Sequence, residues 1–149
     1  MQAKDIMTRE VITVTPEEKV EEVARILAEH KFSGVPVVDA RGCVQGIVTE
    51  SDLIVRAGDL HIPFYITLFD SIIFLENPRR FHKQLEKFTA IQVQDIMTTR
   101  VLTVTSDTPV SEIASLMTDK KINRVPVVDD DQLVGIITRN DIVRCLVKQ

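Results

Sequence analysis

The feature that most constrains this chain is an internal duplication. When the sequence is aligned with itself after a shift of 90 positions, residues 5–39 lie opposite residues 95–129, and 17 of these 35 positions are identical. The segment DIMT recurs unchanged, VITVT returns as VLTVT, and GVPVVD returns as RVPVVD. Matches at a fixed spacing are typical of repeated structural units. The fold must therefore contain the same unit twice.

The first copy predicts the order strand, helix, strand, strand, helix. A short β-branched strand at 11–14 is followed by Thr15, Pro16 and Glu18, which suit the cap, first turn and capping box of a helix. The remaining predicted elements are strands at 35–38 and 44–48 and a helix from about Ser51.

The second copy repeats this order. Its predicted elements are a strand at 101–104, a helix at 109–118, strands at 125–128 and 133–137, and a helix from Asn140. A copy of about 50 residues buries too little apolar surface to be stable alone. We therefore predict an α+β protein in which two β-α-β-β-α repeats pack face to face about a pseudo-twofold axis.

Between the copies lies an insert with a different composition, so that the predicted domains are 1–56, 57–94 and 95–149. Five of the six phenylalanines and the single tyrosine lie within the insert. We predict helices at 67–76 and 80–88. The aromatic side chains are expected to close the core or a dimer interface, with a dedicated partner or a membrane surface as the less favoured alternatives.

Composition excludes several classes of protein. A net charge of −4 argues against a chain that grips nucleic acid through its phosphates. Cys43 and Cys145 lack metal-ligand or CxxC spacing, which fits a reducing compartment. The apolar run at 62–75 is shorter than a membrane span and contains Asp70, and MQAKDIMTRE lacks the apolar core of a signal peptide. We expect a cytoplasmic protein without a membrane span.

One strand-to-helix turn occurs twice, as GIVTESD at 46–52 and as GIITRND at 135–141. The spacing of Thr49 and Asp52 has the form of a capping box, so both side chains could serve only the helix start. The same threonine and aspartate recur, however, while the two residues between them differ. A carboxylate there can accept hydrogen bonds from both hydroxyls of a ribose, and a threonine hydroxyl at a helix N-terminus can meet a phosphate. The recurrence favours this second interpretation.

Taken together, the duplicated motifs resemble the cystathionine-β-synthase (CBS) domain pair, also called a Bateman module. The resemblance covers residues 5–56 and 95–147 and leaves the insert unexplained. It implies a regulatory, energy-sensing module that binds AMP, ADP, ATP or S-adenosylmethionine as a regulatory ligand, with no prosthetic group. It also implies a homodimer and a regulated partner on another chain.

The resemblance further implies two ligand sites, each built from both copies. The first site would use Thr15, Phe32, Ser33 and Val35 around the adenine, with Thr138 at a phosphate and Asp141 at the ribose. The mirrored site would use Thr105, Ile122, Asn123 and Val125, with Thr49 and Asp52.

The copies differ in charge at two positions of these sites. Arg124 stands where relatives often place a phosphate-binding arginine, whereas the first copy has Gly34. Arg139 follows Thr138, whereas the first copy has the acidic Glu50. Each site is thus expected to hold one arginine, and Glu50 would repel phosphate in the mirrored site. We predict that the site of Asp141 is the tighter one.

The chain lacks the common catalytic motifs GxxxxGK[ST], GxGxxG, GxSxG and HExxH, and its three histidines have no spacing suited to a metal. We therefore predict a protein that is not an enzyme and holds no metal. The alternative function is a protein–protein interaction module with vestigial pockets that acts through the aromatic insert. An enzyme fragment, or an effector of an unfamiliar ligand such as a cyclic dinucleotide, is the least favoured option.

Overall fold

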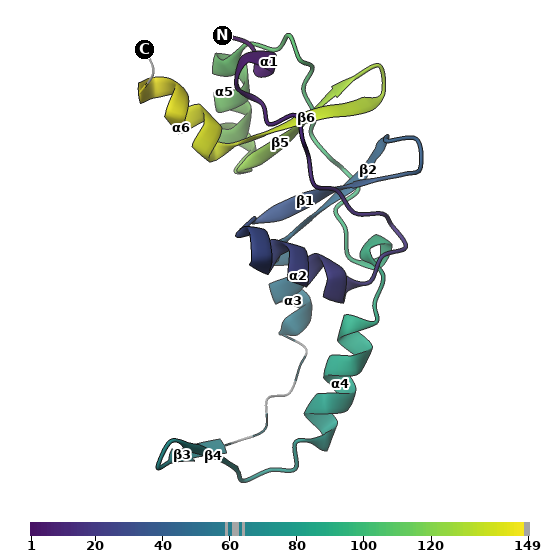
Figure 1. Ribbon diagram of the computed structural model, residues 1–149, viewed down its shortest axis with the longest axis vertical. Helices are drawn as coiled ribbons and strands as arrows, with labels where there is room; N and C mark the ends of the chain where they lie inside the picture. The colour runs from purple at the N-terminus through teal and green to yellow at the C-terminus, as the bar shows by residue number, and fades with distance from the viewer. Residues whose placement is uncertain (59, 61–62, 64, 148–149) are drawn as a thin grey trace.

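The computed structural model describes residues 1–58, 60, 63 and 65–147 (Figure 1). Its elements are α1 (Ala3–Ile6), α2 (Val20–His30), β1 (Gly34–Val38), β2 (Val44–Thr49), α3 (Glu50–Ala57), β3 (Tyr65–Leu68), β4 (Ser71–Phe74), α4 (Arg79–Thr89), the 3-10 helix η1 (Val93–Asp95), α5 (Val110–Lys120), β5 (Arg124–Asp129), β6 (Gln132–Thr138) and α6 (Arg139–Val147). Helices combine with small antiparallel sheets, which confirms the predicted α+β class.

The elements form two similar halves with an arm projecting from one of them (Figure 1). The upper half contains α1, α5, β5, β6 and α6, and the lower half contains α2, β1, β2 and α3. The arm contains β3, β4 and α4 and extends away from both halves. The pseudo-symmetric pairing of the two repeats is therefore as the duplication predicts.

Each half is built on a two-stranded antiparallel sheet with the same register. Gly34 pairs with Thr49 in the lower sheet, and Arg124 pairs with Thr138 in the upper one. Both sheets carry an irregularity near the end of their first strand. The predicted strands at 11–14 and 101–104 are reduced to single parallel bridges, from Val14 and Val104.

The start of α2 differs from the prediction. Thr15 does not cap this helix, which begins at Val20 after Lys19. The carbonyls of Pro16 and Glu18 instead accept hydrogen bonds from the backbone N–H groups of residues 94 and 93, at 2.9 and 2.8 Å. A long-range backbone contact thus overrides the local capping signal.

The repeated DIMT segments cross between the halves. Thr8, from the first segment, pairs with Ile136 on β6 of the upper half. Thr98, from the second segment, pairs with Ile47 on β2 of the lower half. Each segment therefore completes the sheet of the other copy.

Glycine allows these segments to approach closely. A Cβ atom at Gly135 would lie 2.5 Å from the sulfur of Met7, and one at Gly46 would lie 2.7 Å from the sulfur of Met97. Both distances are well below an ordinary van der Waals contact of about 3.5–4.0 Å. The glycine of each repeated turn is thus required by the methionine of the other DIMT segment.

Each half has its own apolar core, and each core includes residues that cross over. The upper core contains Ala3, Met7, Ile113, Met117, Val125, Val127 and Ile137. The lower core contains Val14, Val23, Leu27, Val35, Val37, Val48 and Val93. Ala3 and Met7 precede the first copy's own helix, and Val93 precedes the second copy, so neither half closes its core without the other.

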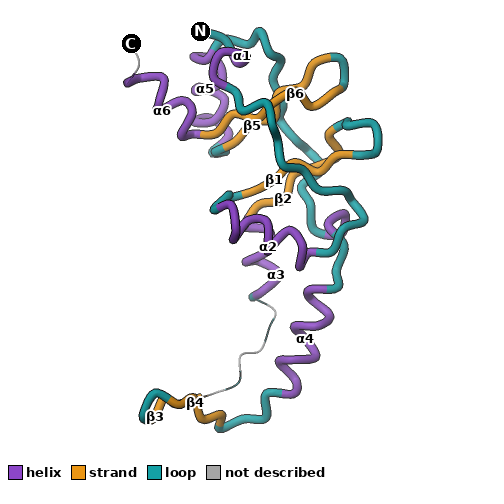
Figure 2. Tube along the Cα trace, viewed as in Figure 1, coloured by secondary structure: helices purple, strands orange, loops and turns teal. Residues whose placement is uncertain are grey.

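The insert is only partly helical (Figure 2). The predicted helix at 67–76 is wrong, because β3 and β4 form a hairpin there. Phe69 and Asp70 have φ values of 48° and 64°, as a two-residue hairpin turn requires. The predicted second helix corresponds to α4.

Candidate functional site

The repeated turn places a threonine and an aspartate at the start of α3 and of α6. Oδ2 of Asp52 accepts a hydrogen bond from the backbone N–H of Thr49 at 2.8 Å and another from its hydroxyl at 3.1 Å. Oδ2 of Asp141 accepts from the backbone N–H and the hydroxyl of Thr138, both at 2.8 Å. The helix-capping role is therefore present in both copies.

Capping occupies one oxygen of each carboxylate. Within the part of the chain that the structure describes, Oδ1 of Asp52 and Oδ1 of Asp141 accept no hydrogen bond. Asp141 is half-buried and lines a pocket. Helix capping and ligand binding are thus compatible at this residue.

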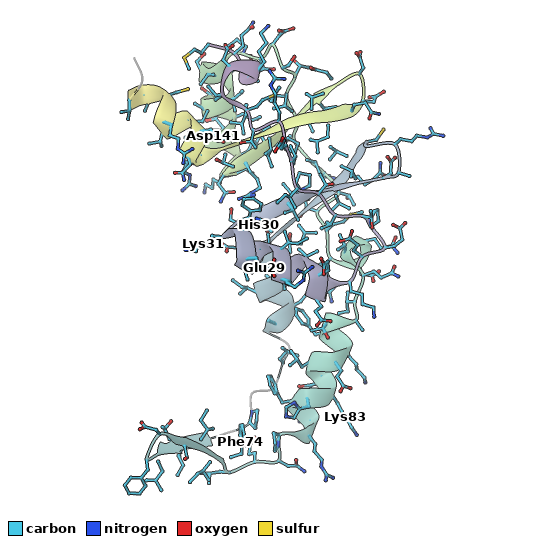
Figure 3. The ribbon with its side chains drawn as sticks, in the orientation of Figure 1. Glu29, His30, Lys31, Phe74, Lys83 and Asp141 are labelled. Atoms are coloured by element: carbon cyan, nitrogen blue, oxygen red, sulfur yellow. The ribbon has the colours of Figure 1, made fainter. Side chains whose placement is uncertain are left out.

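A pocket of about 520 Å³, called pocket A, lies between the two halves. Its lining includes eight of the predicted site residues, Phe32, Ser33, Val35, Asn123, Arg124, Thr138, Arg139 and Asp141. Figure 3 shows Asp141 on the upper half and His30 and Lys31 on the lower half, on the same side of the molecule. Pocket A therefore draws on both copies.

Pocket A carries more positive than negative side chains. Its cations are Lys31, Arg124, Arg139 and Arg144, and its acids are Glu10 and Asp141. One wall holds His30 and Phe32, whose rings are stacked with centroids 5.2 Å apart and planes 16° apart. A flat aromatic surface beside an excess of positive charge suits a planar, anionic ligand.

A second pocket of about 310 Å³, called pocket B, contains part of the mirrored site. Its lining includes Thr49, Glu50, Ile122, Asn123 and Arg124. Two further cations, Arg100 and Lys121, also line it. Asp52 is not part of this lining, so pocket B lacks the carboxylate that distinguishes pocket A.

Arg124 lies between the pockets and lines both, which differs from the expected one arginine per site. Its side chain crosses to the other copy, where Nη1 donates to the carbonyl of Gly34 and Nη2 donates to the hydroxyl of Ser33. Burial lowers the pKa of Arg124, while the nearby negative charge of Glu50 opposes this shift. An arginine remains charged even so.

Four predicted site residues do not line pocket A or pocket B. Asp52 is used in capping, and Thr15 accepts a backbone hydrogen bond from Glu18 at 3.2 Å. The hydroxyl of Thr105 lies 3.1 Å from the hydroxyl of Thr108, and Val125 is fully buried in the upper core. Contact of these residues with a ligand stays a prediction.

Several lining residues were missed by the sequence interpretation. Lys31 of pocket A and Lys121 of pocket B occupy equivalent positions of the duplication, and both end a helix with φ of 54°. The recurrence of this lysine in both copies could have indicated that it belongs to the sites. Arg144 follows Asp141 at a spacing that puts both on one helix face, which could have indicated Arg144 as well. The stretch 8–12 reaches pocket A through the crossed DIMT segment, and no local pattern indicates that contact.

A search of the described residues finds no group of three or more His, Cys, Asp and Glu side chains that could hold a metal ion. Over the same residues, no helix is both long enough and apolar enough to cross a bilayer.

Comparison with known proteins gives matches over nearly the whole chain. Residues 3–58 and 93–148 match the family described as CBS domain. The chain is 30% identical over 155 residues to the uncharacterized protein MJ1426 of Methanocaldococcus jannaschii, covering 99% of this chain and 92% of that protein. Several other curated relatives are longer, and the chain spans between 22% and 60% of their length.

Two similar solved structures contain adenosine compounds. The structure of CBSX2 in complex with AMP, a protein of Arabidopsis thaliana, has a TM-score of 0.75 and 28% identity, covering 99% of this chain and 96% of that one. The domain pair of protein MJ0100, in complex with 5′-methylthioadenosine and S-adenosyl-L-methionine, has a TM-score of 0.70 and 30% identity, covering 99% and 97%.

Proposed function

Because this chain belongs to the CBS domain family, we propose that it is a non-catalytic regulatory module that binds adenosine-containing ligands between its two repeats. Similar domain pairs have been solved with AMP and with S-adenosyl-L-methionine. Occupancy would be transmitted to a partner chain or through a homodimer.

The observation that carries this proposal is the composition of pocket A. Asp141 there has a carboxylate oxygen that its capping role leaves free, and two adjacent ribose hydroxyls can donate to it. The stacked rings of His30 and Phe32 come from the other repeat and offer a face for adenine. A single ligand would thus contact both repeats and fix their relative position.

The charges of pocket A favour a nucleotide over a sulfonium compound. Its four cations, Lys31, Arg124, Arg139 and Arg144, outnumber its two acids, Glu10 and Asp141. This excess of positive charge attracts the phosphate groups of a nucleotide, whereas it repels the positive sulfur of S-adenosylmethionine. We therefore assign AMP, ADP or ATP to pocket A.

Pocket B is the weaker site in this proposal. Asp52 is not among its lining residues, and Glu50 adds a negative charge to the lining that would repel a phosphate. The predicted order of affinities, with the site of Asp141 ahead, rests on these two differences.

A matched pair of variants tests the proposal. Asp141→Asn and Asp52→Asn each retain a side-chain oxygen for the helix start and remove the charge. At 100 times its dissociation constant a ligand stabilises the fold by about 2.7 kcal/mol. This corresponds to a melting shift of about 5–10 °C for a chain of this size.

We expect AMP to give this shift in the wild type and in Asp52→Asn but a much smaller one in Asp141→Asn, with S-adenosylmethionine less effective than AMP throughout. The proposal is refuted if AMP, ADP, ATP and S-adenosylmethionine all leave the transition unmoved. Equal losses in the two variants would refute the assignment of the tighter site.

The insert favours a second candidate function, self-association through the β3–β4 hairpin. Among the described strands, β3 and β4 pair only with each other. Leu68, Phe69 and Ile72 are 49%, 93% and 60% exposed. A two-stranded hairpin is marginally stable alone in water, and its open edges can pair with another strand. A second copy of the chain offers an identical edge and identical apolar side chains.

Sedimentation equilibrium tests this candidate. Ile72→Asp is expected to weaken the dimer at least tenfold, because it buries a charge in the paired hairpins. Val55→Asp is the matched control, since Val55 is 74% exposed on α3, outside the insert. A wild type that stays monomeric, or a dimer that neither variant affects, would exclude the insert as a dimer surface.

A further inference from the structure

Pockets A and B share three lining residues, Ser33, Asn123 and Arg124. Arg124 is the charged member of this set. A ligand with a phosphate gains most from such a side chain, because a guanidinium can donate two parallel hydrogen bonds to it. The two pockets therefore adjoin one shared phosphate-binding group.

The guanidinium of Arg124 is bonded to neutral groups. It donates to the carbonyl of Gly34, to the hydroxyl of Ser33 and, through Nε at 3.4 Å, to Oδ1 of Asn123. The residue is only 9% exposed, and within the described chain it forms no ion pair with a carboxylate. A buried charge without a bonded counterion is costly, so an incoming anion gains by pairing with it.

The opposite repeat cannot supply a second arginine. Gly34 is the pseudo-symmetric equivalent of Arg124, since these residues pair with Thr49 and Thr138 in their respective sheets. A Cβ atom at Gly34 would lie 2.8 Å from the carbonyl oxygen of Val48, and that oxygen belongs to the backbone. The duplication thus provides two pockets with one guanidinium between them.

We propose that pockets A and B compete for Arg124, so that a phosphate-bearing ligand in one pocket lowers the affinity of the other for such a ligand. This inference rests on the proposed binding of adenosine compounds. Binding in pocket A draws the guanidinium toward the phosphate, so that pocket B loses one of its three cations and keeps Arg100 and Lys121 beside its acid, Glu50. By linkage the effect is reciprocal, and couplings of this kind change affinities by about 5- to 150-fold.

Site-resolved titration with AMP and with adenosine tests the proposal. The methyl groups of Ile12 and Ile136 line pocket A, and those of Ile47 and Ile122 line pocket B, so methyl NMR follows each site separately. The comparison is between the wild type and Asp141→Asn, in which pocket A stays empty at moderate AMP concentration while Arg124 is intact.

With AMP we expect pocket B to bind about tenfold more tightly in Asp141→Asn than in the wild type, in line with typical coupling energies. With adenosine, which carries no phosphate, pocket B should have the same affinity in both proteins. Arg124→Met should remove the difference seen with AMP. Arg100→Met is the matched control, because Arg100 lines pocket B but not pocket A. Its loss should weaken AMP binding in pocket B by the same factor in the wild type and in Asp141→Asn.

The outcomes separate the two proposals. If AMP binds both pockets but pocket B has one affinity in the wild type and in Asp141→Asn, competition for Arg124 is refuted and the proposed function stands. If AMP, adenosine, ADP, ATP and S-adenosylmethionine all leave these methyl signals unshifted, the proposed function fails and the competition fails with it.

Discussion

Gly135→Ala should destabilise the protein through the crossed segment rather than through the turn that holds the glycine. The added Cβ would lie 2.5 Å from Sδ of Met7 and 2.8 Å from its Cγ. An ordinary contact is about 3.5–4.0 Å, so the thioether must retreat by at least about 1 Å. Met7 is 9% exposed and sits in the upper core, where there is little free space. Overpacking of this kind costs about 1–3 kcal/mol.

Urea unfolding and thermal melting measure this cost. A loss of 1–3 kcal/mol lowers the melting temperature by roughly 2–12 °C for a chain of this size. Met7→Ala alone should cost about 2–5 kcal/mol by leaving a cavity. In the double variant the new methyl enters that cavity, so the double cost should fall below the sum of the single costs by about 1 kcal/mol or more.

Gly58→Ala serves as the control, because Gly58 ends α3 with a φ of −60° that alanine adopts freely. Its cost should stay within about 0.5 kcal/mol. Additive costs for Gly135→Ala and Met7→Ala would refute the argument, since they would show that the two side chains do not contact each other in solution.

Three further predictions concern other sites. Gly42→Ala should lower stability by about 1–2 kcal/mol in urea unfolding, because Gly42 has a φ of +81°, where a Cβ atom is strained. The backbone N–H of Ser106 donates to Asp129 at 3.0 Å and holds the pKa of Asp129 below its usual value. The ionised Asp129 therefore stabilises the fold above its unfolded pKa and ceases to do so as pH falls through its folded pKa, so Asp129→Asn should flatten the loss of stability between about pH 5 and pH 2. Lys31→Met should weaken AMP binding in pocket A severalfold by calorimetry while Lys121→Met leaves that pocket unchanged, and the reverse result would overturn the assignment of their pockets.

The repeated parts of the fold were predictable because duplication doubles each local signal. The strands at 34–38 and 124–129 and the turns that follow them have the residues that such elements need, and both copies agree. Eight residues of pocket A follow from the same motifs together with the family resemblance. For these strands and for the helices that follow the repeated turns, the interpretation of the sequence is correct to within a few residues, whereas the strands predicted at 11–14 and 101–104 are single bridges although both copies indicated them.

The remaining features depend on contacts between distant residues. Thr15 has the local form of a helix cap, yet hydrogen bonds between the backbone at 16–18 and η1 move the start of α2 to Val20. The pairing of Thr8 with Ile136 brings residues 8–12 to pocket A, and no periodicity encodes that pairing. The wrong prediction of a helix in place of the hairpin at 65–74 has a different cause. Its β-branched and aromatic residues favoured strands over the predicted helix.

The crossed DIMT segments bear on how such a protein can originate and be synthesised. In a polypeptide with a single copy, the DIMT segment would have no sheet of a second copy to pair with. Two such polypeptides would have to exchange their DIMT segments, as in domain swapping. Fusion into one chain replaces that encounter between molecules by a tethered one, whose effective concentration does not fall on dilution. During translation, the sheet of the first copy stays incomplete until Thr98 has left the ribosome, because Ile47 can pair with Pro36 of β1 but not yet with Thr98 on its other side.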